Sequence, residues 1–308
     1  MATHSLRFAL SALASVLVLV SCGRDDPRPG RDSAVDRIPE EERFGGTVVV
    51  ASIMDPQSMN ALVSNEDDSR QVQRELLFMP LVKYDGALEP MPWLAERWDT
   101  ARVAPDTLEL TFHLRRDVSW HDGQPTTAED VLFTYERVLD PNVGSSLASG
   151  FALYSPHAEL VDSHTIKFRL RPHAEFLDGW AQLAVMPQHI LEDVPHEKLA
   201  SHPFGTSEPV GNGPFRFVRR VPGQEWVFEA NPNFPAALGG RPYLDRLVYR
   251  VIPEQTTLLT ETLTGAVDVN LAVGAEQVSQ IEAAPGVELR SSPTTQWVFI
   301  AWNGRLPM

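Results

Sequence analysis

LELTFHLRRDVSWHDGQPTTAEDVLFTYERV, residues 108–138, changes its hydrophobic period within one short stretch. Over residues 106–115 apolar side chains alternate with polar ones, which predicts a strand with one buried face. Residues 120–123 predict a turn. Thr126 is expected to begin a helix, because Glu129 follows three residues later and completes a capping box. A strand, a turn and a helix in direct succession indicate a mixed α/β fold.

The rest of the chain repeats this mixture without an internal repeat. Helical spacing predicts helices at 69–78, 254–264 and 275–283, and Gly265 is the expected C-terminal stop of the second. Strands are predicted at 44–52, 163–170, 215–221, 225–230, 246–252, 267–269, 287–291 and 297–302. The strands at 215–221 and 225–230 are expected to pair as a hairpin, and residues 246–269 to form a β-α-β unit.

Composition excludes several classes of function. The 308 residues are 43% hydrophobic and 22% charged, which is typical of a folded globular protein. The formal net charge of -15 disfavours a nucleic-acid partner, because a polyanion is repelled on average. Cys22 is the single cysteine, so an intrachain disulfide and a zinc site built from cysteines are excluded.

The first residues are typical of a secretory signal peptide. Arg7 precedes an apolar run over residues 8–20, which is too short to cross a bilayer core of about 30 Å. The run ends in Leu-Val-Ser-Cys, which resembles a bacterial lipobox. Residues 1–21 are therefore interpreted as a signal peptide and Cys22 as a lipidated mature N-terminus; the alternative is an ordinary signal peptide with a chance cysteine. Residues 22–43, mostly charged after Cys22, are predicted to be a flexible tether.

Patterns of known catalytic chemistry are absent from the sequence. It contains no GxxxxGK[ST], no HExxH and no GxSxG, and its histidines are scattered. The neighbouring carboxyl groups of Asp67 and Asp68 are either an acid–base pair or part of a solvated polar loop at 64–68, and the loop is the preferred interpretation. A secreted hydrolase would need a nucleophile–base pair, and none is recognisable.

Ordered short patterns run along residues 44–308. They include FHLR (112–115), WHDGQP (120–125), TAEDV (127–131), VGNGPF (210–215), NPNF (231–234) and LTGAVD (263–268). Further matching segments are GGT (45–47), ELLFMPLV (75–82), PWLAERW (92–98) and WN (302–303). Together these segments resemble the family 5 solute-binding proteins of bacterial ABC importers, the oligopeptide- and dipeptide-binding type.

The resemblance implies a fold of the periplasmic-binding-protein type (class II, family 5). Lobe I would be built from residues 44–79 and 190–308, and lobe II would be inserted at 80–189, with mixed sheets in both. Family members continue beyond the strand that ends at Trp302-Asn303 into a third lobe. The chain is therefore expected to be a truncated copy or a fragment that lacks this lobe and its main ligand clamp.

Candidate ligand-binding residues follow from the same resemblance. They are Asn65, Glu66 and Asp67 in the loop after the first strand, Gln296 and Trp297 in the last strand, and Trp302 and Asn303 near the hinge. Residues 145–154 are a weaker candidate. No catalytic residue, metal ligand or cofactor is predicted. Residues 121–123 are interpreted as a structural turn, in which Asp122 accepts hydrogen bonds from turn amides and Gly123 takes a positive φ.

The implied function is that of an extracytoplasmic substrate-binding component of an ABC importer, not an enzyme. It would be anchored by lipid at the membrane, act as a monomer, capture peptides and deliver them to a permease. Nickel chelates, opines and oligosaccharides are alternative solutes of the same family. Two further alternatives are a secreted lipoprotein hydrolase and a scaffold or chemoreceptor partner that uses the same fold.

Overall fold

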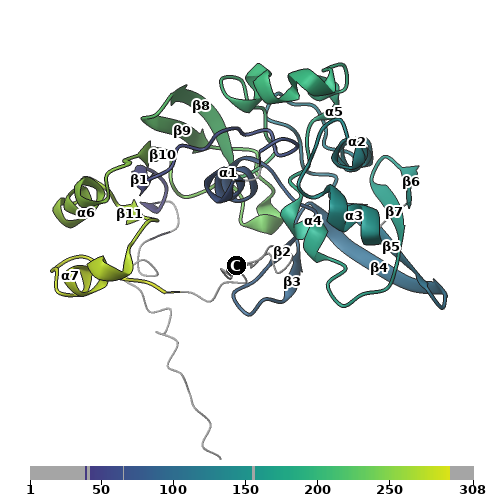
Figure 1. Ribbon diagram of the computed structural model, residues 1–308, viewed down its shortest axis with the longest axis horizontal. Coiled ribbons are helices and arrows are strands. Elements are labelled where there is room, and N and C mark those ends of the chain that lie inside the picture. Colours follow the sequence, from purple (N-terminus) through teal and green to yellow (C-terminus); the bar gives the residue numbers. More distant parts are fainter. Residues whose placement is uncertain (1–38, 40–41, 65, 155–156, 292–308) are drawn as a thin grey trace, which may run out of the picture. The chain divides into compact units, whose positions relative to one another are not determined.

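The computed structural model of the 308-residue chain describes residues 39, 42–64, 66–154 and 157–291. Its contacts divide the chain into Met1–Arg43 and Phe44–Met308. The labelled helices and strands of Figure 1 all lie in the second unit. Within the described residues, no helix is both long and apolar enough to cross a membrane.

A five-stranded mixed sheet holds one end of this unit together (Figure 1). Its strands are β1 (Thr47–Ser52), β8 (Phe215–Val221), β9 (Glu225–Ala230), β10 (Arg246–Val251) and β11 (Val269–Asn270). The order is β11-β1-β10-β9-β8, with β1 parallel to both of its neighbours and β9 antiparallel to both of its own. The predicted hairpin of β8 and β9 is confirmed.

The predicted β-α-β unit is confirmed as β10, α6 (Gln255–Thr264) and β11. β1 lies between its two strands in the sheet. α6 packs Leu258 against Ala51 and Ile252 in a small apolar cluster. The helix ends at Gly265, whose φ of 76° is left-handed, as its predicted role as a C-terminal stop requires.

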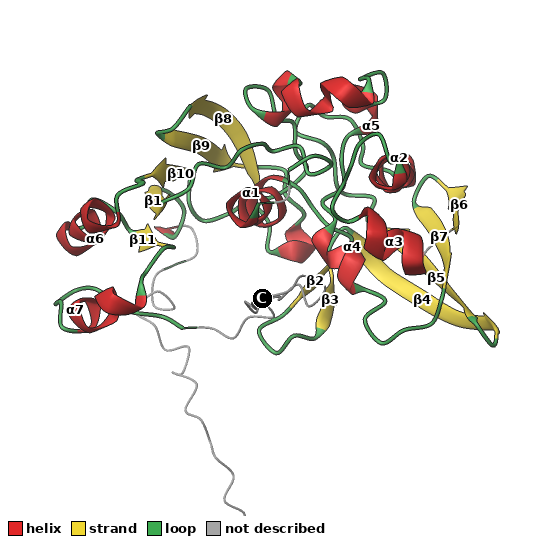
Figure 2. Ribbon diagram, viewed as in Figure 1, coloured by secondary structure: helices red, strands yellow, loops and turns green. Residues whose placement is uncertain are grey.

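A four-stranded antiparallel sheet forms the second layer of regular structure. Its strands, in spatial order, are β4 (Ala95–Ala104), β5 (Thr107–Leu114), β7 (Thr165–Leu170) and β6 (His157–Asp162). The predicted alternation of β5 is confirmed, because Leu110, Phe112 and Leu114 are buried while the residues between them are half-exposed. This sheet lies beside α2 (Ala128–Leu139), α3 (Ala148–Tyr154) and α4 (Asp178–Gln182), as Figure 2 shows.

Aromatic side chains join these helices to the sheet. The ring of Trp180, on α4, lies 4.1 Å from that of Phe168 and 4.6 Å from that of Phe151, measured between ring centroids. Phe112 of β5 meets Trp180 at 5.5 Å in an edge-on arrangement. Such tilted contacts add to the stabilisation from buried area. They fix α4, which forms part of the candidate site, onto the sheet.

Shorter elements connect the two sheets. α1 (Asp67–Val72) continues directly into a π-helical turn (Gln73–Leu77), and β2 (Val82–Tyr84) pairs with β3 (Pro90–Pro92) as a hairpin. The remaining elements are α5 (Gln188–Leu191), α7 (Val278–Glu282) and 3-10 turns at His196–Ser201, Pro203–Gly205, Ala236–Leu238 and Ala275–Gln277. One hydrophobic core contains both Phe112 and Phe228, so the two sheets share it. The division into lobes I and II stays a prediction.

The start of α2 differs from the prediction by one residue. Thr127, not Thr126, caps the helix, and Asp130 takes the role predicted for Glu129. The Asp130 carboxylate accepts from the amide of Thr127 at 2.9 Å and from that of Gln188 at 2.9 Å. Asp130 is buried and Glu129 is not. The capping carboxylate is therefore the one that also accepts a hydrogen bond from the distant amide of Gln188.

Two predicted segments are wrong. Residues 287–291 form no strand, because a strand needs a neighbour for its backbone groups and, among the described residues, none pairs with this segment. Asp67 and Asp68 form the first turn of α1 instead of a polar loop. Carboxylates are favourable at the positive end of a helix dipole. The strand predicted at 297–302 lies outside the described residues.

Candidate functional site

Two of the sequence patterns, WHDGQP (120–125) and VGNGPF (210–215), meet in a tightly bonded joint between the sheets. The term joint denotes the contacts of residues 211–213 with two partners. The first partner is His121, and the second is the end of the π-helical turn at Leu77. The carbonyl of Gly211 accepts from the amide of His121 at 2.7 Å. The Gly211 amide donates to Nδ1 of His121 at 3.2 Å, and Nε2 of the same ring donates to the carbonyl of Gly213 at 3.1 Å. These partners require a neutral imidazole protonated on Nε2.

Asn212 forms hydrogen bonds with three other residues at the joint. The amides of Asn212 and Gly213 donate to the carbonyl of Leu77 at 3.1 and 2.9 Å. The side-chain oxygen of Asn212 accepts from the amide of Met79 at 2.9 Å, and its nitrogen donates to Thr126 Oγ1 at 3.4 Å. Asn212 is buried, so these bonds replace those it would make to water.

The joint has no room for a ligand. A Cβ at Gly211 would lie 1.9 Å from the carbonyl oxygen of Leu77, and one at Gly213 would lie 2.6 Å from that of Leu76. Burial lowers the pKa of His121 to about 4, which keeps the ring in the neutral form that its bonds require. The patterns around residues 121 and 211–213 therefore build the scaffold.

The turn at 120–123 has the predicted construction. Gly123 takes a φ of 93°, and the Asp122 carboxylate accepts from the amide of Gln124 at 3.1 Å. The other carboxylate oxygen of Asp122 lies 2.8 Å from Nε2 of His189. The turn is thus held from two sides.

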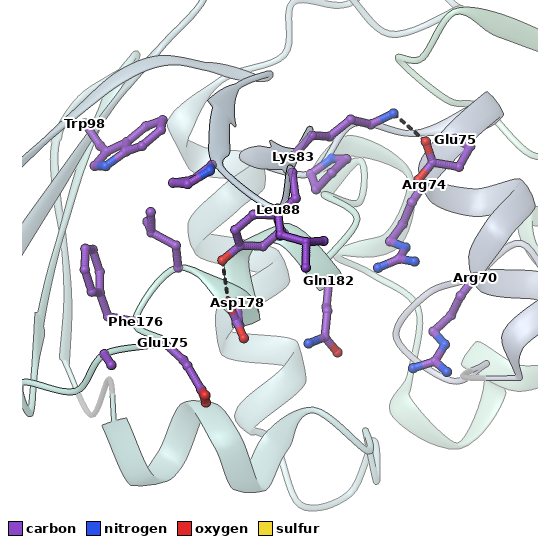
Figure 3. A pocket seen from close by; sticks show the side chains of 16 residues that line it. Arg70, Arg74, Glu75, Lys83, Leu88, Trp98, Glu175, Phe176, Asp178 and Gln182 are labelled. Atoms are coloured by element: carbon purple, nitrogen blue, oxygen red, sulfur yellow. Dashed lines mark hydrogen bonds and ion pairs between the residues drawn. The ribbon is translucent and has the colours of Figure 1, made fainter. Parts of the chain in front are cut away.

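A cavity of about 880 Å³ opens beside the joint and is the candidate ligand site (Figure 3). Its walls come from α1 and the π-helical turn, the β2–β3 hairpin, β4 and the segment around α4. The lining residues are Arg70, Arg74, Glu75, Pro80, Lys83, Tyr84, Leu88, Pro90, Trp98, Ala174, Glu175, Phe176, Leu177, Asp178, Ala181 and Gln182. Both charged and apolar groups line it, which suits a ligand with polar ends and an apolar body.

Most charged groups of the cavity already have a protein partner. Nζ of Lys83 lies 2.6 Å from Oε2 of Glu75 and 4.3 Å from the centroid of the Trp93 ring. The hydroxyl of Tyr84 donates a hydrogen bond to the carboxylate of Asp178, and burial, together with that carboxylate, raises the pKa of the phenol. These pairs join the hairpin to the π-helical turn and to α4, so they shape the cavity.

Arg74 differs from these groups. Its Nε is buried and has no hydrogen-bond partner among the described residues. Burial lowers the pKa of the guanidinium, against the attraction of Glu75, but arginine stays charged in proteins. Figure 3 shows Arg74 and Arg70 at the same end of the cavity, with Gln182 across from them.

Leu88, at the tip of the β2–β3 hairpin, lines the cavity in a strained conformation. Its φ is 64°, and it is the one residue other than glycine with a positive φ in the described part of the chain. Asp85 holds the tip, because its carboxylate accepts from the amides of Ala87 and Glu89 at 2.8 and 2.9 Å. Strain of this kind at a cavity wall is often associated with function.

A second cavity of about 320 Å³ adjoins the first. Both are lined by Glu175, Phe176, Asp178 and Gln182. The second is also lined by Ser146, Leu147, Ser149, Gly150 and Phe151, which belong to the segment 145–154 predicted as a weaker candidate. Sequence reasoning missed the principal lining residues. The spacing of Arg70 and Arg74, one helical turn apart, was the available signal.

The predicted site residues lie partly within the described chain. The Glu66 carboxylate accepts from Ser64 Oγ at 2.6 Å, just before α1, and Asp67 forms an ion pair with Arg70. Asp67 therefore contacts a residue that lines the cavity, although neither acid lines it. Asn65, Gln296, Trp297, Trp302, Asn303 and Cys22 lie outside the described residues.

The arrangement around Asp68 does not resemble a hydrolytic site. Its Oδ1 accepts from Ser52 Oγ and from the Tyr249 hydroxyl, both at 2.8 Å. A serine that donates to a carboxylate in this way ties β1 to α1. Within the described residues, no group of three histidine, cysteine or acidic side chains is placed to hold a metal ion.

A large cavity lined by charged and apolar groups is the usual form of a small-molecule binding site. Residues 89–308 match the model of the bacterial extracellular solute-binding proteins, family 5, middle region, and the chain belongs to this family. That family consists of solute-binding proteins and not of enzymes. The family 5 resemblance and the binding-protein fold expected from the sequence are thereby confirmed.

Individual relatives cover most of this chain. It is 29% identical over 261 residues to the oligopeptide-binding protein AppA of Bacillus subtilis, which covers 84% of this chain and 46% of that protein. The structure of AppA in complex with a nonapeptide matches with a TM-score of 0.68 at 28% identity, over 79% of this chain and 47% of that one. NikZ from Campylobacter jejuni in complex with Ni(L-His) matches with a TM-score of 0.67 at 27% identity, over 80% and 46%. The chain spans about half the length of the relatives it matches.

Proposed function

We propose that this chain is the substrate-binding component of a bacterial ABC importer that captures peptides and delivers them to a membrane permease. The cavity between the β2–β3 hairpin, the π-helical turn and α4 is the observation that carries the proposal, because a family of solute-binding proteins needs such a site. Capture is a binding event without chemical turnover.

A peptide is the ligand class that fits this cavity best. Cationic side chains gather at one end of it, near Arg74, and Glu175 lies away from them at the opposite side in Figure 3. Leu88, Trp98 and Phe176 supply apolar surface. A short peptide has the same composition, with charges of opposite sign at its ends and variable side chains between. The relative AppA, solved with a nonapeptide, supports this choice.

A small chelate or another solute is the second candidate ligand. The relative NikZ was solved with Ni(L-His), and AgaA, 28% identical, with agropinic acid. Both ligands carry carboxylates, so they share with peptides the chemistry that the cationic end of the cavity would recognise.

The location follows from the sequence patterns at the start of the chain. Residues 1–21 would direct export, Cys22 would carry the lipid, and residues 23–43 would tether the binding unit outside the cytoplasm as a monomer. Metabolic labelling with a fatty-acid analogue tests the anchor. Labelling should be lost in Cys22→Ser, and equal labelling of the two proteins would contradict the anchor.

Thermal unfolding with a mixture of tripeptides that have free termini tests the peptide assignment. A ligand that binds only the native state stabilises it, by about 2.7 kcal/mol at a hundredfold excess over Kd. We expect the mixture to raise the Tm. An unchanged Tm with tripeptides, together with a raised Tm with nickel plus histidine, would contradict the peptide assignment and identify a chelate as the ligand.

A further inference from the structure

Two arginines one helical turn apart dominate one end of the cavity. Arg70 lies in the last turn of α1, and Arg74 lies in the π-helical turn that continues this helix. In Figure 3 the side-chain amide of Gln182, on α4, faces part of the cavity, and both guanidinium groups point toward that same part. Three groups able to donate hydrogen bonds thus converge from two sides of the cavity.

The guanidinium of Arg74 is half-buried beside the cavity. Its Nε is withdrawn from solvent and has no hydrogen-bond partner among the described residues. The other N–H groups of this half-buried guanidinium are the ones that can donate into the cavity. A ligand that brings an anionic acceptor to these groups would pair a partly desolvated charge, which is a favourable exchange.

Other charges in the cavity do not compete for this role. Lys83 is bound to Glu75 at 2.6 Å, and the carboxylate of Asp178 accepts from Tyr84. Arg70 is paired with Asp67 through NH2, and a guanidinium has further N–H groups to donate. The chain as a whole is strongly acidic, with a net charge of -15, so attraction of an anion must come from local groups.

We propose that Arg74, assisted by Arg70 and Gln182, binds a carboxylate of the ligand and so fixes its direction in the cavity. For a peptide this is the C-terminal carboxylate. The planar fork of a guanidinium matches the two oxygens of a carboxylate, and a charge-assisted pair of this kind is stronger than a neutral hydrogen bond. This inference rests on the proposed function, because it assumes that the cavity holds the ligand.

Isothermal titration with three forms of one tripeptide mixture tests the subsite. The forms have a free C-terminus, an amidated C-terminus, and an amidated C-terminus with one added glutamate side chain. We expect amidation to weaken binding about tenfold to a hundredfold, which is the usual range for loss of a charge-assisted bond. Recovery of affinity by the glutamate form would assign the subsite to side-chain carboxylates as well.

The protein variants separate the subsite from general charge effects. In Arg74→Gln most of the difference in affinity between the free and amidated peptides should be lost, whereas Arg97→Gln should keep the full difference. Arg97 pairs with Asp99 at 2.6 Å on β4, does not line the cavity and changes the net charge equally. Arg70→Gln should reduce the difference in part and serves as a second variant if Arg74→Gln does not fold.

The outcomes distinguish this inference from the proposed function. Binding of both peptide forms with equal affinity to the unaltered protein would overturn the carboxylate subsite and leave a peptide-binding protein. A preference for the free C-terminus that is undiminished in Arg74→Gln would place the carboxylate elsewhere. Binding of neither form would overturn the peptide assignment and this inference with it.

Discussion

The joint and the cavity lie next to each other and differ in almost every physical respect. At the joint, His121 and Asn212 have protein partners for their ring and amide groups, and Gly211 could not accept one additional carbon atom. At the cavity, Arg74 has a buried donor without a partner and Leu88 has a strained backbone. The joint holds the sheets together, whereas the cavity is lined by charged groups, among them the half-buried Arg74, that a ligand can contact.

The most recognisable sequence patterns belong to the joint. Few residues could replace a glycine that lies against a carbonyl or a histidine whose two ring nitrogens bond to one loop. Residues under such constraints are therefore easy to recognise in a sequence. The cavity depends on long side chains that reach it from several elements. The sequence pattern therefore identifies the scaffold and says little about which ligand is bound.

Substituting Gly211→Ala should have the largest effect. The new Cβ would overlap the carbonyl oxygen of Leu77, and the backbone on both sides is fixed by hydrogen bonds. We expect a loss of about 4 kcal/mol or more in the free energy of unfolding, measured by urea denaturation. Gly86→Ala is the control, because nothing lies within 4 Å of its added carbon. Equal losses in the two variants would contradict a tightly packed joint.

Acid should weaken the joint through His121. The pKa of its ring is about 4 in the folded protein, below its ordinary value of 6.5, so folding favours the neutral form. This contribution is complete above about pH 6.5 and is lost as the pH falls to about 4, by a total of about 3 kcal/mol. The groups facing the ring are Arg216, which lowers the pKa, and Asp122, which raises it.

Urea denaturation at pH 7, 5.5 and 4.5 measures this dependence. The curve for His121→Gln should fall less steeply than that of the unaltered protein, because a glutamine does not titrate. His164→Gln, at an exposed turn, is the matched control and should keep the original slope. An unchanged slope in His121→Gln would show that the ring is not held neutral.

Arg74→Met should stabilise the protein in the absence of ligand. The substitution removes a buried donor without a partner and keeps most of the apolar stem, so we expect a gain of about 1 kcal/mol in the free energy of unfolding. Arg97→Met, which breaks an exposed ion pair, should change it by about 0.5 kcal/mol or less. A clear loss of stability in Arg74→Met would show that Arg74 supports the fold.

Leu88→Gly should give the smallest change in stability. Glycine adopts a φ of 64° without strain, and the exposed leucine has little packing to lose, so a gain of about 0.5 kcal/mol is expected from thermal unfolding. Peptide affinity should fall because the apolar contact at the hairpin tip is removed. Unchanged affinity would place Leu88 outside the ligand's reach.

Much of the fold could be predicted from local patterns. The strand β5, the hairpin of β8 and β9, and the stop of α6 at Gly265 depend on alternation and on glycine, which are visible in the sequence. The cap of α2 lies one residue after the predicted position because Asp130 also accepts a hydrogen bond from the amide of Gln188, 58 positions away in the sequence. β4 gave no signal because most of its side chains are exposed.

The site was less predictable. Arg70 and Arg74 can be recognised as neighbours on a helix, but their convergence with Gln182 depends on how α4 packs through Trp180 onto the four-stranded sheet. Likewise, nothing local indicates that Leu88 takes a positive φ. Tertiary packing, which sequence periodicity does not contain, decided both.

Amide hydrogen exchange with and without the free tripeptide mixture tests most directly the claim that the joint is scaffold and the cavity binds ligand. We predict slow exchange at residues 211–213 in both states, and slower exchange with peptide at residues 83–90 and 174–182, which form cavity walls. Peptide-dependent protection at the joint, with no change at these walls, would contradict the account.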